Sequence, residues 1–108
     1  MVKQLEIQAC TLPTEAQPLR VREFDALLAT VVRSAQRIGP LTLRVDLLPT
    51  PEVAATVANL LVRETACCSF FTFNLVASDG SLELDITVVP RQTAVLDAIS
   101  ERVRAVRA

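Results

Sequence analysis

The sequence feature that most constrains the fold is the dipeptide Asp79-Gly80, which lies between two stretches of alternating apolar residues. Before it, Phe71, Phe73 and Leu75 recur at every second position, and after it the apolar residues are Leu82, Leu84, Ile86 and Val88. Such alternation is typical of strands with one buried face. Asp-Gly is a favoured pair for a two-residue turn between antiparallel strands. The segment therefore predicts a β-hairpin.

Two further segments alternate in the same way. In residues 2–10 the apolar side carries Leu5, Ile7 and Ala9, and the other side carries Gln4, Glu6, Gln8 and Cys10. In residues 41–47 the apolar side carries Leu41, Leu43, Val45 and Leu47. Both segments are predicted to be strands.

Three segments have the three- and four-residue apolar spacing of helices. The first runs from about Val21 to Ile38 and is ended by Gly39-Pro40. The second has Thr50 as N-cap and Pro51 at its first position, and it runs into Cys67 and Cys68. The third is a closing helix whose apolar residues are Leu96, Ile99, Val103 and Val106.

These elements predict a single α+β domain spanning residues 1–108, in the order βαβαββα. The simplest arrangement is a two-layer sandwich, with the helices on one face of a four-stranded mixed sheet. Right-handed crossovers would make the first three strands parallel and the fourth antiparallel to the third.

Several classes of protein are disfavoured by composition. The chain has no histidine and only two glycines, far apart, which removes histidine-dependent catalysis, histidine-based zinc sites and glycine-rich phosphate loops. We therefore expect no enzyme activity. A net charge of −1 and the absence of Trp and Tyr argue against nucleic-acid binding. No apolar run approaches the roughly 20 residues of a membrane span, and "MVKQLEIQAC" lacks the apolar centre of a signal peptide, so a cytoplasmic location is expected.

The adjacent cysteines Cys67 and Cys68 are the strongest candidate for chemistry. Their Cα atoms are held about 3.8 Å apart, too close for an ordinary disulfide, so free thiols are expected. Two neighbouring sulfurs can bind one soft ion such as copper(I), mercury(II) or arsenite. Glu64 lies one turn earlier and shares that end of the helix. The helix dipole and Glu64 both disfavour a thiolate in the absence of metal.

A third thiolate could come only from Cys10. In the expected topology Cys10 ends a strand, whereas Cys67 and Cys68 end a helix that runs antiparallel to the strands. An eight-residue strand spans roughly 26 Å, so Cys10 is expected at the opposite end of the sheet. A second chain or a folded-back loop would defeat that argument.

Three interpretations of the cysteine pair remain open: packing at a tight joint beside Phe70, Phe71 and Phe73, soft-metal binding, and thiol redox chemistry. The segment "ETACCSFFTF" resembles the motif E-x-x-C-C-x-F-x-x-F of small uncharacterised bacterial proteins. "CTLPTEAQPLRVREFDALL" resembles their N-terminal block. The resemblance implies a loose association with metal-responsive MerR-type regulators and no established activity. It carries over Glu64, Cys67 and Cys68 as candidate positions, and Cys10 more weakly.

The other sheet face offers a second hypothesis, a non-catalytic interaction module. It is mostly polar, but Leu48, Phe70, Val76 and Val89 also fall there by parity. Clustered, they would form a patch for a homodimer or a transcriptional regulator. On the same face, Arg44 and Asp46 are expected to pair with Glu83 and Asp85. The arginines of the last helix, and Arg33 and Arg37 near the end of the first, are explained by the helix dipole.

Overall fold

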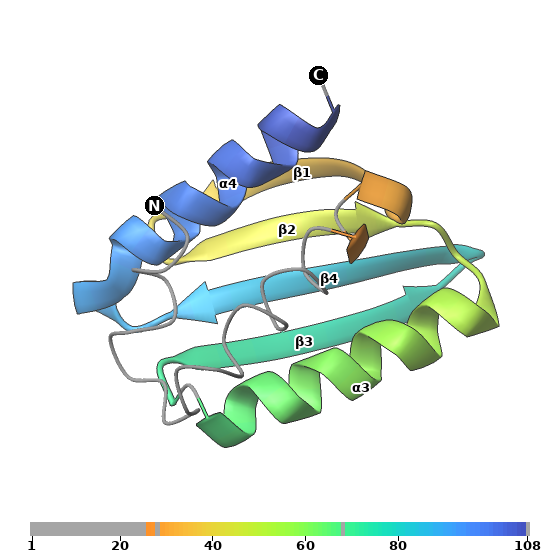
Figure 1. Cartoon of the computed structure of the whole chain (residues 1–108), viewed down its shortest axis with the longest axis horizontal. Coiled ribbons are helices and arrows are strands. Elements are labelled where there is room, and N and C mark those ends of the chain that lie inside the picture. Colours follow the sequence, from red (N-terminus) through yellow and green to blue (C-terminus); the bar gives the residue numbers. More distant parts are fainter. Residues whose placement is uncertain (1–25, 28, 68, 108) are drawn as a thin grey trace.

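The computed structural model describes residues 26–27, 29–67 and 69–107, and the expected strand at residues 2–10 lies outside them. Two helices lie against a four-stranded sheet (Figure 1). The elements in chain order are β1 (Val32–Gly39), β2 (Thr42–Leu47), α3 (Pro51–Cys67), β3 (Phe71–Ser78), β4 (Ser81–Val88), the 3₁₀ turn η2 (Pro90–Gln92) and α4 (Thr93–Arg107). The α+β class is confirmed, and from β2 onward the elements follow the expected order.

The strands lie in the order β1-β2-β4-β3, and every pairing between them is antiparallel. The expectation of a mixed sheet with parallel strands is therefore wrong for the described strands. The crossover through α3 does return β3 in the direction of β2. However, β4 folds back from β3 and lies between the two, where it pairs with both. Strands that share a direction are thus never neighbours in this sheet.

The expectation of a helix from Val21 to Ile38 is wrong for residues 32–38. Residues 26–27 and 29–30 are helical, but Val32–Gly39 forms strand β1. This strand lies at an edge of the described sheet, and most of its side chains are exposed on both faces. It lacks the apolar alternation of a half-buried strand, as is common for edge strands. Gly39-Pro40 consequently leads into a turn between β1 and β2 instead of ending a helix.

The strand assignment of residues 32–39 changes the explanation of two arginines. Arg33 and Arg37 lie on a strand, so the helix dipole does not explain them. Arg37 instead donates a hydrogen bond to Asp97 of α4, and Arg33 lies 3.9 Å from Asp46 of β2. Ile38, expected on the buried side of a helix, is 41% exposed.

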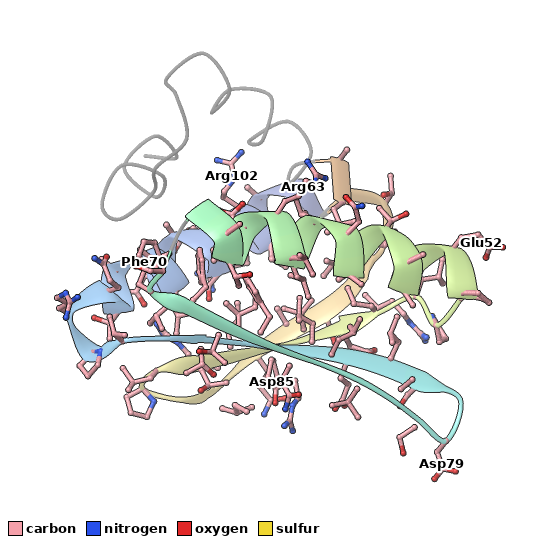
Figure 2. The ribbon with its side chains drawn as sticks, turned by 90° about the horizontal axis from the view of Figure 1, so that it is seen from below. Glu52, Arg63, Phe70, Asp79, Asp85 and Arg102 are labelled. Carbon is pink, nitrogen blue, oxygen red and sulfur yellow. The ribbon has the colours of Figure 1, made fainter. Side chains whose placement is uncertain are left out.

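The core lies between the sheet and the two helices, as expected for helices on one face. Figure 2 shows both helices on one side of the sheet and Asp85 on the other. Alternate residues of β2 and β4 face the helices, and α3 and α4 contribute their apolar stripes. The most deeply buried side chains are Leu43, Val45, Leu47, Val57 and Leu96. Burying one such side chain stabilises the fold by roughly 1.5–3 kcal/mol.

The ends of the elements follow the sequence closely. Val53 N–H donates a hydrogen bond to the Thr50 hydroxyl at 3.1 Å, which confirms the N-cap of α3. Asp79 and Gly80 have φ values of 55° and 75°, the left-handed conformation that a two-residue hairpin turn requires. The β3–β4 hairpin is therefore confirmed with its turn at the expected dipeptide.

Candidate functional site

The expected cysteine site lies where α3 gives way to β3. Cys67 is the last residue of α3, residues 69–70 form a turn, and Phe71 begins β3. The backbone of Cys67 is therefore placed, whereas its side chain and the whole of Cys68 and Cys10 lie outside the described part. Among the expected ligands, Glu64 is the one whose side chain the structure describes.

Glu64 is 3% exposed, the one charged residue buried among those described. It extends the apolar stripe of α3, in which Val57, Leu60 and Leu61 face the core. A buried carboxylate without a partner is costly. In the described residues no buried side-chain nitrogen or oxygen lacks a hydrogen-bond partner, so Glu64 is held in place. A fixed, buried carboxylate thus lies one turn before the cysteine pair.

Aromatic rings fill the joint after the cysteines. The ring centroids of Phe70 and Phe71 are 4.6 Å apart, and those of Phe71 and Phe73 are 5.0 Å apart. Phe70 is 4% exposed and Phe71 is 8% exposed. Placing Phe70 on the outer sheet face was therefore wrong. Because Phe70 belongs to the turn before β3, strand alternation cannot be extended back to it.

The described side chains contain no group of three or more Cys, Asp or Glu that could hold a metal ion. The structure thus places Glu64 and the Cys67 backbone within the last two turns of one helix.

The outer sheet face is built from paired polar side chains. Arg44 Nε and Nη2 donate to the two carboxylate oxygens of Asp85, at 2.8 and 3.0 Å, and Glu83 lies 3.7 Å from Arg44. The hydroxyls of Thr42 and Thr87 share a hydrogen bond of 3.0 Å. The expected pairing with the acids of β4 is confirmed for Arg44, whereas Asp46 lies 3.9 Å from Arg33 of β1 instead.

The Arg44–Asp85 contact changes the titration of both groups. The hydrogen bond from Arg44 holds the pKa of Asp85 below its ordinary value. The same bond, followed by the negative charges of Asp85 and then Glu83, raises the pKa of Arg44. Both side chains therefore stay charged over a wide pH range, which suits a structural ion pair better than acid-base catalysis.

The apolar patch expected on this outer face is reduced. Val76 is 42% exposed and lies opposite Glu83, and Leu48 is also 42% exposed. Val89 is partly buried against the core, and Phe70 is buried. Two of the four residues are therefore packed inward, and the outer face is mainly polar.

An apolar groove, which the sequence pattern does not predict, lies along β3. Val62 of α3 is 69% exposed, although it is apolar and the helix is otherwise well packed. A hollow of about 230 Å³ beside it is lined by Ala58, Leu61, Val62, Thr65, Phe73 and Leu75. The sequence does indicate that Val62 is exposed, because Val62 lies outside the apolar stripe of α3 formed by Val53, Val57, Leu60 and Leu61.

In the part of the chain that the structure describes, no helix combines the length and apolar character needed to cross a membrane. Comparisons with protein families, with curated proteins and with solved structures found no match for this chain.

Proposed function

We propose that this chain is a small cytoplasmic accessory protein that binds a soft metal or metalloid ion through the thiolates of Cys67 and Cys68. Glu64 assists from one turn earlier, and Cys10 is a further candidate ligand. The observation that carries the proposal is the burial of Glu64, at 3% exposure, one helical turn before the cysteine pair. The resemblance to motif-bearing bacterial proteins associated with MerR-type regulators supports a role in metal stress or metal-linked regulation.

The chemistry of this helix end favours soft ions. Thiolate sulfur prefers copper(I), mercury(II) and arsenic(III) to hard cations such as magnesium. Binding releases thiol protons, and a nearby carboxylate can accept a hydrogen bond from a thiol or stabilise a coordinated cation. Phe70 and Phe71, which follow the pair in the chain, are both buried and supply hydrocarbon to this joint.

A binding experiment tests the proposal. Anaerobically purified full-length protein is titrated with copper(I), mercury(II) or arsenite and analysed by native mass spectrometry. We expect one ion per chain, and we expect Cys67→Ser/Cys68→Ser to abolish binding while the circular dichroism spectrum is unchanged. Ser69→Ala, at the exposed next position, is the matched control and should bind as the parent does. Unchanged binding by the double variant would remove the proposal.

The second candidate function is a non-catalytic interaction module in which the cysteines serve only packing. The observation in its favour is Val76, an apolar side chain 42% exposed on a polar outer face. Here we infer a homodimer, or docking to a transcriptional regulator, through that face. Light scattering after size-exclusion chromatography should then show a dimer that Val76→Asp dissociates and Thr72→Asp does not. A monomer at all concentrations, with no regulator retained, would count against it.

A further inference from the structure

The groove along β3 borders a free strand edge. β3 is the last strand of the described sheet, so one side of its backbone has no neighbour among the described strands. The hollow beside Val62 lies between this edge and α3, and Phe73 and Leu75 of β3 form its floor. A free edge flanked by an apolar groove is the arrangement to which an extended segment adds as another strand.

The two edge strands of the described sheet, β1 and β3, differ in the side chains that an added strand would contact. On the helix-facing side, β1 presents Arg37, which is ion-paired with Asp97 of α4. On the same side, β3 presents Phe73 and Leu75, both partly exposed. A strand that carries apolar residues on one face would bury them at β3, but would meet charged groups at β1.

The chain supplies a segment of that kind. Residues 2–10 carry Leu5, Ile7 and Ala9 at alternate positions, with polar residues between them. Residues 11–25 connect this segment to the described part and can span roughly 50 Å when extended. The longest dimension of the molecule is 38 Å, so the segment can reach the β3 edge of its own chain.

We propose that residues 2–10 pair with the free edge of β3 as an antiparallel fifth strand, with their apolar side in the groove beside Val62. Residues directly opposite in such a pair face the same side of the sheet. A register that aligns the strand ends places Ala9, Ile7 and Leu5 opposite Phe71, Phe73 and Leu75. The antiparallel direction follows every other pairing in the described sheet.

The direction decides where Cys10 lies. In the antiparallel arrangement Cys10 falls just beyond Phe71, at the same end of the sheet as Cys67, where α3 ends. In a parallel arrangement it would fall near Ser78, about 27 Å away. The expected separation of Cys10 from the cysteine pair depends on parallel strands, and the pairings in the described sheet are all antiparallel. In this register Cys10 lies opposite Phe70, one position beyond β3, so strand alternation does not fix the side of the sheet to which its thiol turns. Cys10 is then the third thiolate, a consequence that rests on the proposed function.

Hydrogen exchange of the full-length protein tests the docking without any metal. Ile7→Asp, on the apolar side of the segment, should speed amide exchange in residues 71–78 by roughly tenfold or more. Gln8→Asp, on the polar side, is the matched control and should leave these amides protected. Exchange in β1 should be the same in both variants. Leu5→Ser is a milder second variant if Ile7→Asp unfolds.

Three results would overturn the docking. The first is an unchanged rate in residues 71–78 in both Ile7→Asp and Leu5→Ser. The second is a change that appears in β1 instead, which would place the segment at the other edge. The third is protection of β3 that appears only as the protein concentration rises, which would mean that a second copy supplies the strand.

Cross-linking tests the strand direction, again without metal. In Cys68→Ser, mild oxidation should join Cys10 to Cys67 within one chain, as read by mass spectrometry of proteolytic fragments. The control variant is Lys3→Cys/Cys10→Ser/Cys68→Ser, in which the cysteine of the segment lies at its other end. In this variant Cys67 should not form a cross-link. The reverse pattern would overturn the antiparallel direction while leaving metal binding by Cys67 and Cys68 intact.

The role of Cys10 as a third thiolate ligand is tested separately, by measuring the affinity for arsenite. Cys10→Ser should weaken arsenite binding at least tenfold, whereas Cys67→Ser/Cys68→Ser should abolish it. An arsenite affinity that is the same in Cys10→Ser and the parent would remove Cys10 from the site. If the parent and every variant fail to bind while the Cys10–Cys67 cross-link forms, the docking stands and the proposed function fails.

Discussion

Arg37 of β1 is hydrogen-bonded to Asp97 of α4, a residue 60 positions later in the chain. The contact joins β1, the edge strand whose sequence pattern predicts a helix, to α4, the helix that closes the fold. It gives Arg37 a specific partner on the helix layer.

This ion pair predicts a measurable coupling. We expect Arg37→Ala and Asp97→Ala each to lower the free energy of unfolding, and a double-mutant cycle to give a coupling of about 0.2–1 kcal/mol, because the pair is partly exposed. Urea unfolding provides the measurement. Arg104→Ala/Glu101→Ala, an exposed pair within α4, is a control for pairs that do not join two elements. A coupling of zero for Arg37 and Asp97 would contradict the contact.

The strand assignment of residues 32–39 predicts unequal costs of truncation. Leu96 is fully buried, so Leu96→Ala should cost about 2–5 kcal/mol. Ile38 is 41% exposed, so Ile38→Ala should stay within about 0.5 kcal/mol of the parent. Thermal or urea unfolding of both variants checks this. A large cost at Ile38 would instead favour the helix that the sequence pattern suggested.

The burial of Phe70 predicts a contrast with Val76. Phe70→Asp puts a charge into the core beside Phe71 and should prevent folding at ordinary temperature, because Phe→Ala already costs about 3–5 kcal/mol at such sites. Val76→Asp changes an exposed side chain and should leave a folded protein. Circular dichroism distinguishes the two. A folded Phe70→Asp would return that side chain to the outer face.

The Arg44–Asp85 contact predicts a pH dependence of stability. The folded pKa of Asp85 is lowered, so the contact stabilises the protein fully above the unfolded pKa, near 4. That contribution is lost as the pH falls below about 4 and through the folded value. Asp85→Asn should therefore flatten the loss of stability in acid. Equal acid slopes for the parent and Asp85→Asn would contradict the contact.

Much of the second half of the fold was predictable because each of its elements carries one clear sequence pattern. Leu82, Leu84 and Ile86 alternate strictly, and Thr50 and Asp79-Gly80 mark the start of a helix and the turn of a hairpin. Strand order was not predictable, since the insertion of β4 between β2 and β3 depends on long-range pairing. β1 was missed because an edge strand with few buried residues lacks the alternation that identifies a strand.

The candidate site was predictable only in part. The pattern correctly placed Glu64 and Cys67 near the end of one helix. That Glu64 is buried could not be read from the sequence, because a glutamate on a helix is usually exposed. The groove at Val62 required knowledge of which strand lies at the edge. In the proposed docking of residues 2–10, the position of Cys10 depends on strand direction, about which the alternation of apolar residues carries no information.

The most direct measurement of the central proposal is the rate at which a thiol reagent labels Cys67 and Cys68 in the native protein. Our account predicts rapid labelling of both, suppressed by one equivalent of arsenite or mercury(II) per chain. Labelling that requires denaturation, at a rate that neither ion alters, would contradict it and would leave the two cysteines as packing residues of the joint.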